Sequence, residues 1–174
     1  MLLFRSRFSL RLLNFFIDKH AYPGIISLAM KPELPKIEYL QASDLQAQNI
    51  IDFWKQNSIT VTATDSPEEV EGAARLHPQL FIVALDPNSR IIGTVWGTFD
   101  GRRGYIAHLA VDAPYRALGL GSLLMEQVEI EFKKMNCYKI HLFVEEHNAA
   151  VGNFYRRRGY TEREDLTVFS KTLR

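Results

Sequence analysis

The apolar and polar positions of residues 37–79 follow one strand pattern and two helix patterns. Ile37–Leu40 predicts a short strand. Ser43–Gln46 has the capping-box form, in which a side-chain oxygen is followed three residues later by Gln. We expect a helix from this box to about Gln56 that buries its apolar residues, namely Leu45, Ile50, Ile51 and Trp54. Ser66–Glu69 predicts a second helix start, because Pro holds the first position and acids fill the first turn.

Three further apolar runs have the length of strands. They cover Leu80–Leu85, Ile91–Phe99 and Tyr105–Val111. The segments between them, Asp86–Ser89 and Asp100–Gly104, consist of residues that favour turns. We therefore expect consecutive antiparallel strands, the first two of which form a hairpin.

The pattern changes after Val111 to a loop, a helix of about seventeen residues and a strand at Tyr138–Val144. One side of the helix has apolar residues at i, i+4 spacing, namely Leu120, Leu124, Val128 and Phe132. The opposite, solvent-facing side has Glu126, Glu129, Lys133 and Lys134. A strand, a helix and a strand over this length predict a right-handed crossover between two parallel strands.

The remaining residues predict one more helix and one more strand. Asn148 is expected to cap a short helix that ends at Gly159, and Thr167–Thr172 is expected to form a last strand. The whole pattern predicts an α/β (mixed α+β) fold. Its central mixed sheet is mostly antiparallel with one parallel βαβ crossover, and helices cover both faces.

Composition narrows the class of protein. The 174 residues suit one domain with a sizeable core, and 47% apolar with 24% charged residues is ordinary for a globular protein. A net charge of +1 gives no argument for a nucleic-acid partner. The single cysteine, Cys137, excludes an internal disulfide and a cysteine-based metal site, so we expect no metal. No apolar run approaches the roughly 20 residues that span a bilayer.

Residues 1–36 differ from the predicted domain at residues 37–174. The first thirty residues contain four basic residues against the single acid Asp18, a net charge of +3. This segment could be a transit peptide, a basic helix on a membrane surface, an extra packed helix, or sequence upstream of a natural start at Met30. Pro32 and Pro35 follow it as a linker would. We expect a cytoplasmic protein, or an organellar one if the segment is a transit peptide.

The loop that leads from the third strand into the long helix suggests a phosphate site. It reads Arg116-Ala117-Leu118-Gly119-Leu120-Gly121-Ser122. Glycines allow backbone N–H groups to approach a phosphate, and a helix N-terminus adds partial positive charge. Arg116 adds a full charge, which suits the diphosphate of a nucleotide-like cofactor. A helix start without a ligand is the alternative.

This loop, of the form Arg-x-x-Gly-x-Gly, is neither a dinucleotide fingerprint nor a P-loop. It resembles the diphosphate loop of the GNAT superfamily of acyl-CoA-dependent N-acetyltransferases, and it lies in the same order of elements. A second segment, Asn148–Tyr160, contains Phe154-Tyr155 and Gly159-Tyr160 and is similar to that family's Asn…Phe-Tyr-x-x-x-Gly-Phe/Tyr motif. The nearest likeness is to small bacterial members with unassigned substrates.

The resemblance implies a role for each matching residue. The backbone of Leu109, Ala110 and Val111 would pair with the pantetheine arm of acetyl-CoA, and one N–H would hold the developing oxyanion. The N–H groups of residues 117–122 would bind the diphosphate. Asn148 would hydrogen-bond the arm or the bound acetyl-CoA nearby. Tyr155 would protonate the departing thiolate as general acid.

An amine acceptor also needs a base, because a primary ammonium has a pKa of about 10.4. Many relatives place a Glu on the corresponding strand, but residues 104–109 contain no carboxylate. His108 is the titratable residue best placed for this role. Glu145 and Glu146, after the next strand, are alternatives. The run Arg156–Arg158 could meet the cofactor's 3′-phosphate or could simply be solvated.

The sequence therefore predicts an acetyl-CoA-dependent N-acetyltransferase that acts on a primary amine of a small molecule in a ternary complex. A protein N-terminal or lysine acetyltransferase and a non-catalytic acyl-CoA-binding module are the alternatives. The acceptor depends on the first helices and on the loop Ile59–Asp65, which carry no readable code. Expected partners are acetyl-CoA and an amine, with a possible homodimer and no membrane for the domain.

Overall fold

The structure is a computed structural model that describes residues 36–39 and 46–173. The chain divides into two units, residues 1–33 and 34–174, and every described residue belongs to the second unit. The predictions for residues 1–35, including the targeting segment and the prolines, lie outside the described residues. So do Ser43, Asp44 and Leu45.

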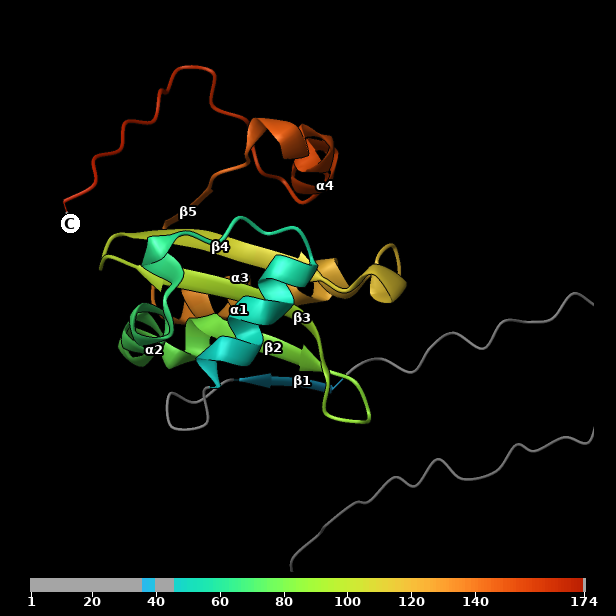
Figure 1. The fold of residues 1–174 in the computed structure, drawn as a ribbon. Coiled ribbons are helices and arrows are strands. Elements are labelled where there is room, and N and C mark those ends of the chain that lie inside the picture. Colours follow the sequence, from blue (N-terminus) through green and yellow to red (C-terminus); the bar gives the residue numbers. More distant parts are fainter. Residues whose placement is uncertain (1–35, 40–45, 174) are drawn as a thin grey trace, which may run out of the picture. The chain divides into compact units, whose positions relative to one another are not determined.

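The centre of the second unit is a five-stranded sheet in the order β1-β2-β3-β4-β5 (Figure 1). Its strands are β1 (Lys36–Tyr39), β2 (Phe81–Leu85), β3 (Ile91–Phe99), β4 (Arg103–Val111) and β5 (Lys139–Leu142). The first four strands pair antiparallel, and β4 pairs with β5 in parallel. The predicted mixed, mostly antiparallel sheet with one crossover is confirmed.

Helices α1 (Ala47–Gln56) and α2 (Pro67–Leu76) connect β1 to β2. The start predicted for α2 is confirmed, because the Ser66 hydroxyl accepts the N–H of Glu69 at 3.3 Å and Pro67 holds the first position. The start predicted for α1 is wrong by about three residues. Gln46 lies outside the helix at its N-cap, and its side chain accepts a hydrogen bond from the Asn49 side chain.

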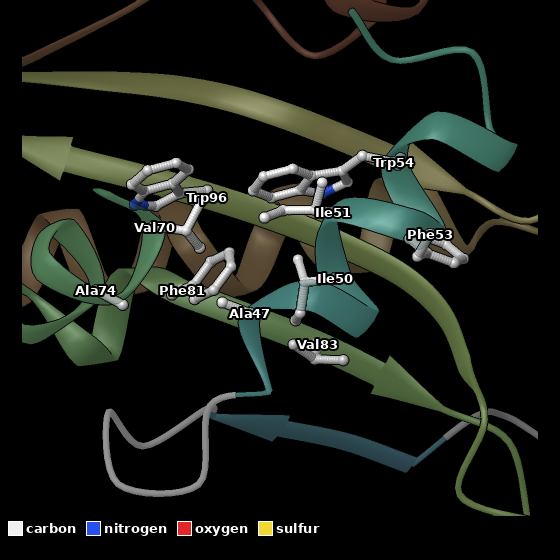
Figure 2. Close-up of a cluster of buried hydrophobic side chains, with 11 residues drawn as sticks. Ala47, Ile50, Ile51, Phe53, Trp54, Val70, Ala74, Phe81, Val83 and Trp96 are labelled. Atoms are coloured by element: carbon white, nitrogen blue, oxygen red, sulfur yellow. The ribbon is translucent and has the colours of Figure 1, made fainter. Parts of the chain in front are cut away.

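The first of two core clusters lies between the sheet and helices α1 and α2 (Figure 2). Trp54 of α1 stacks on Trp96 of β3 with ring centroids 6.0 Å apart, and both rings contact Phe81 of β2. Ile50, Ile51 and Trp54 are buried as expected. This cluster holds the connection between α1 and α2 against the middle of β3 and β4.

The second cluster lies on the opposite face, beneath α3 (Leu120–Lys134). The stripe predicted to be buried is confirmed, since Leu124, Val128 and Phe132 have no exposed surface. Phe132 packs against two strand glycines. A Cβ added at Gly104 would lie 2.6 Å from its ring, and one added at Gly97 would lie 2.8 Å from it. Glycine at these positions lets α3 approach the sheet closely, and helices cover both faces as predicted.

Three predictions near the C-terminus are corrected. β5 covers only Lys139–Leu142. Asn148 does not cap a helix but lies inside the 3₁₀ segment Glu146–Val151, because its N–H already donates to the carbonyl of Glu145, which holds the N-cap position. The segment Thr167–Thr172 is not a strand. It has no neighbouring strand to pair with among the described residues, and Phe169 is 92% exposed. The last helix, α4, is Gly152–Arg157, and Gly159 follows it with the left-handed φ of +85° that was expected.

Candidate active site

β4 is nine residues long and β5 only four, so the two strands pair along part of their length. The parallel ladder runs from Arg103 and Lys139 to Ile106 and Leu142. Beyond that point β4 continues to Val111 with β3 alone as its neighbour among the described strands. Leu109, Ala110 and Val111, the residues predicted to bind a cofactor arm, therefore lie on an open strand edge. Such an edge can pair with an extended ligand as an added strand does.

β4 carries a bulge at the point where this edge opens. Trp96 faces Ala107 and Thr94 faces Ala110, so two residues of β4, His108 and Leu109, oppose the single residue between them. His108 has a φ of +50°, which is uncommon outside glycine. The Thr94 hydroxyl donates to the His108 carbonyl at 3.1 Å and accepts the indole N–H of Trp54 at 3.0 Å. The bulge is thus fixed by a buried chain of hydrogen bonds.

The His108 ring lies on the face of the sheet that α1 and α2 cover. It stacks on Trp54 with ring centroids 4.1 Å apart, and its Nε2 lies 3.2 Å from Oδ1 of Asp65. The other carboxylate oxygen of Asp65 accepts the N–H of Thr62 at 2.7 Å and its hydroxyl at 3.0 Å. Asp65 is only 6% exposed. The result is a buried Asp–His pair whose carboxylate is held in place on both oxygens.

The surroundings of His108 determine whether its ring is charged and which ring nitrogen carries the proton. Burial lowers the pKa of His108, and the charge of Asp65 raises it by less than burial lowers it. Nε2 lies within ion-pair distance of the carboxylate of Asp65, which favours the neutral tautomer that carries its proton on Nε2 and leaves the lone pair on Nδ1. Nδ1 is buried and has no hydrogen-bond partner among the described residues. A neutral imidazole with one free lone pair is a proton acceptor.

Asp65 was not among the residues predicted from the sequence to form the site. The local signal was the spacing of Thr62 and Asp65, which form a capping box around the short 3₁₀ helix Ala63–Asp65. That spacing predicts a turn, but nothing in it indicates a partner 43 positions further along the chain.

The predicted phosphate loop has the geometry of an anion site. Ala117 and Gly119 have φ of +61° and +92°, and α3 begins at Leu120 directly after them. Among the described residues, no acceptor takes the N–H groups of residues 117–122. The loop is exposed from Ala117 to Gly119. Free N–H groups at the start of a fifteen-residue helix are a ready site for a phosphate.

Arg116 links this loop to two other segments. Its Nε donates to the carbonyl of Val111 at 2.9 Å, and one terminal nitrogen donates to Oδ1 of Asn57 at 3.1 Å. Asn57 directly follows α1. The guanidinium therefore lies between the end of β4 and the connection from α1 to α2, with its remaining N–H groups available beside the loop.

The phosphate loop, which ends at Gly121, and the segment Asn148–Tyr160 lie in contact. A Cβ added at Gly121 would lie 3.7 Å from the Phe154 ring, so α4 packs on the first turn of α3. Tyr155, the next residue, has its ring 6.0 Å from that of Tyr160, and burial raises its pKa. Tyr155 therefore keeps its hydroxyl proton at neutral pH. Among the described residues, no hydrogen bond or ring contact joins Tyr155 to His108.

The alternative bases have other partners or surroundings. Glu145 accepts the Thr60 hydroxyl at 2.8 Å and lies 3.4 Å from Nε2 of His147. Glu146 is exposed at the start of the 3₁₀ segment that contains Asn148. The hydrogen bond between Thr60 and Glu145 ties the connection after α1 to the chain that follows β5.

The arginine run is mostly paired within the protein. Arg156 bonds to Asn153 and forms an ion pair with Glu162. Arg158 donates to Glu129 at 3.0 Å. Arg157 is exposed and has no partner among the described residues.

The prediction that Glu129 faces solvent beside Lys133 is wrong. Its carboxylate is half-buried and also accepts the hydroxyl of Tyr160 at 3.0 Å. Burial and this carboxylate together raise the pKa of Tyr160. Glu129 therefore fastens the end of α4 to α3.

Within residues 46–173, no group of three or more His, Cys, Asp or Glu side chains is placed to hold a metal ion. In the same part of the chain, no helix has the length and apolar character that crossing a bilayer requires.

Comparisons with known proteins agree on one family. A family model described as "Acetyltransferase (GNAT) family" matches residues 46–160. An acetyltransferase of Pectobacterium atrosepticum is 31% identical over 138 residues, which are 79% of this chain and 95% of the relative. Glucosamine-6-phosphate N-acetyltransferase of Arabidopsis thaliana is a structural neighbour with a TM-score of 0.58 and 26% identity, covering 82% of this chain and all of that one. The NatC complex bound to a Gag peptide and CoA has a TM-score of 0.65 at 24% identity, covering 74% of this chain and 86% of that one.

Proposed function

The chain belongs to the GNAT family of acetyltransferases, and from this membership we propose that it transfers the acetyl group of acetyl-CoA to the primary amine of a small molecule. The observation that carries the proposal is the pairing of an open β4 edge with a loop of free N–H groups directly after it. The strand edge would bind an extended arm, and the N–H groups of the loop would bind a diphosphate. Together they suit a long, phosphorylated thioester.

The described residues fit acetyl-CoA in this arrangement. The backbone of Leu109, Ala110 and Val111 would pair with the pantetheine arm, and the N–H groups of residues 117–122 would hold the diphosphate. Arg116 would add its free guanidinium N–H groups beside the same phosphates. Asn148 would hydrogen-bond the arm from the segment that follows β5.

The chemistry needs a base, an oxyanion donor and an acid. We assign the base to His108, whose Nδ1 would take one proton from the acceptor's ammonium. The neutral amine then attacks the thioester carbonyl, and an N–H of the β4 edge stabilises the oxyanion that forms. When the intermediate collapses, the C–S bond breaks, Tyr155 donates its proton to the CoA thiolate, and the second proton of the attacking nitrogen returns to the Tyr155 oxygen. His108 releases its proton to solvent. Direct attack in a ternary complex leaves the acetylated amine and free CoA.

The alternatives have less support. The missing strand carboxylate made a non-catalytic acyl-CoA module possible, but the pair of His108 and Asp65 would supply a base in its place. NatC, bound to a peptide, shares only the fold at 24% identity. The Arabidopsis enzyme, named for a phosphorylated amino sugar, is 26% identical. A small-molecule amine is therefore the acceptor that we propose, and a homodimer stays a prediction.

Replacing Gly119 with Val is expected to weaken acetyl-CoA binding at least tenfold. A β-branched residue is strained at a φ of +92°, so the loop that presents the N–H groups would change shape. Titration calorimetry measures the affinity, and circular dichroism checks that the variant is folded. Ser122→Ala is the matched control because it keeps every backbone N–H. Folded wild-type protein that binds neither CoA nor acetyl-CoA would disprove the proposed function.

Replacing Tyr155 with Phe is expected to lower kcat about 10²-fold while changing acetyl-CoA affinity less than about threefold. The substitution removes one hydroxyl and keeps the ring that packs against Tyr160, so only proton donation is lost. Release of CoA thiol with a panel of amines reports turnover, and calorimetry reports affinity. Equal losses of turnover and of acetyl-CoA affinity would show that Tyr155 is a binding or packing residue.

A further inference from the structure

Four side chains of β4 and β5 form a patch on the face of the sheet that carries α1 and α2. In the parallel ladder Arg103 lies opposite Lys139, and Tyr105 lies opposite His141. Their neighbours Gly104, Ile106 and Leu142 point to the other face, where they meet the second core cluster beneath α3. The side chain of His108, the proposed base, lies on the same face as the patch.

Arg103 and Lys139 place two positive charges side by side, with Asp100 near the first and Asp165 near the second but no ion pair to either acid. Neither side chain has a hydrogen bond or ion pair with any described residue. Like charges on directly opposed strand residues destabilise a sheet. Burial and then the charges of Arg103, Lys139 and Arg163 lower the pKa of His141, and the charge of Arg163 is offset by Asp165 through two hydrogen bonds of 2.7 Å. Asp165 is engaged by that arginine, so the patch keeps an excess of positive charge.

His141 adds an unsatisfied polar atom to these charges. Its ring is half-buried and stacks on Tyr105 with centroids 5.8 Å apart. Its Nε2 is closed to solvent and has no hydrogen-bond partner among the described residues. Buried polar atoms nearly always have a partner, so this nitrogen has a hydrogen bond left to offer to a ligand.

The patch adjoins a cavity of about 280 Å³. Tyr105 belongs to both. The other walls come from the end of α2, from the end of β3 and from the acid that follows β3, namely Ala73, Leu76, His77, Thr98, Phe99 and Asp100. The volume is near the lower end for small-molecule sites, and most of the lining is apolar. The apolar part of an acceptor bound there would contact the walls of the cavity, and a charged group of the same acceptor would contact the patch.

We propose that Arg103, Lys139 and His141 bind a carboxylate or phosphate group of the acceptor, so that the substrate is an amine that also carries a negative charge. This inference rests on the proposed acetyl transfer and specifies its substrate class. Arg103 and Lys139 supply charge, and His141 supplies a directed N–H. The anion removes the repulsion between the two cations and fills the vacant hydrogen bond of His141.

Binding of inorganic phosphate to the intact protein gives a test that needs no acceptor. The His141 ring is followed by ¹H–¹⁵N correlation spectra while phosphate is added. We expect a saturable shift with a millimolar Kd, weakened at least tenfold in the double variant Arg103→Gln and Lys139→Gln. Lys133→Gln, an exposed cation of α3 on the other face, is the control and should match wild type. No saturable shift, or equal shifts in both variants, overturns the proposal.

The same titration at saturating CoA separates two sources of the anion. An acceptor site keeps its phosphate response when CoA is bound, whereas a site for one of the cofactor's own phosphates loses it. Loss of the response therefore overturns the assignment to the acceptor. Calorimetry with CoA alone tests the proposed function separately, because CoA binding without a phosphate response contradicts only this inference.

Turnover with matched amines completes the test. An amino acid is compared with its amide, and an amino sugar with its phosphate. We expect kcat/KM to be at least tenfold higher for the charged member of the preferred pair. The Arg103→Gln and Lys139→Gln variant should raise KM for that member at least tenfold, with kcat nearly unchanged and no effect on the uncharged one. Equal kcat/KM values within every pair would refute the anionic acceptor.

Discussion

Replacing His108 with Gln is expected to lower kcat about 10³-fold, within the range for loss of a general base. Gln keeps a hydrogen-bonding group that can reach Asp65, but it cannot accept a proton at neutral pH. The release of CoA thiol from a productive amine measures the loss. His147→Gln is the matched control because His147 is an exposed histidine on the segment after β5, and its turnover should stay near wild type.

The pH profile distinguishes a base from a packing residue. The neutral ring is the active form, and burial holds the pKa of His108 below its ordinary 6.5. kcat/KM should therefore be flat above about pH 6.5 and fall only as the pH drops through that lower pKa. Asp65 is the charged group that faces the ring, since the aromatic residues packed on it, Trp54 and Trp96, do not titrate.

Asp65→Asn should shift the acid limb to still lower pH and reduce kcat about 10²-fold. The shift follows because the carboxylate charge that raises the pKa of His108 is gone. The loss follows because the new amide can donate to Nε2 and hold the ring in the tautomer whose Nδ1 is protonated. Nitrogen chemical shifts of the ring report the tautomer directly. An unchanged tautomer and an unchanged acid limb would reduce Asp65 to a structural anchor.

Replacing Phe132 with Ala is expected to destabilise the fold by about 3–5 kcal/mol. Phe132 has no exposed surface, and its ring fills the space that Gly97 and Gly104 leave between α3 and the sheet. Denaturant unfolding measures the free energy. Glu126→Ala, at an exposed position of the same helix, is the control and should change it by less than about 0.5 kcal/mol.

A second substitution tests the cause of that loss. Gly104→Ala alone should lower the free energy of unfolding by about 1–3 kcal/mol, because its Cβ would lie 2.6 Å from the Phe132 ring. In the Phe132→Ala background the same Cβ enters space that the ring has left. The double variant should therefore be more stable than the sum of the single losses predicts, by about 1 kcal/mol or more. Additive losses would show that the two residues are not in steric contact.

Local chemistry made much of the fold predictable. β3 begins at Ile91 and ends at Phe99 as predicted, because turn residues mark both ends of a continuous apolar run. The start of α2 followed from Ser66 and Pro67, whose roles at a helix N-terminus depend on the chain alone. The stripe of α3 followed from spacing, since the helix period decides which side chains share a face.

What could not be predicted depends on tertiary contacts. The contact between Asp65 and His108 exists because a bulge rotates one residue of β4 toward α1. The regular alternation of side chains along a strand, from which the strands were predicted, does not indicate where a bulge occurs. Asn148 has the chemistry of a cap, yet the chain already turns at Glu145. The run Thr167–Thr172 has strand-forming residues, but a strand also needs a neighbour, and β5 ends at Leu142.

The connection between α1 and α2 is fastened at three points that lead to three different parts of the site. Asn57 bonds to Arg116, Thr60 bonds to Glu145, and Asp65 contacts His108. For protein engineering, these three contacts determine which residues of the connection can be replaced. Residues between the fastenings can be diversified to accept other amines, whereas a graft that replaces the fastenings would disturb the phosphate loop and the base together. A library should therefore vary the exposed residues Ala63 and Thr64, keep Ile59 and Val61 because they pack against the first core cluster, and leave Asn57, Thr60 and Asp65 unchanged.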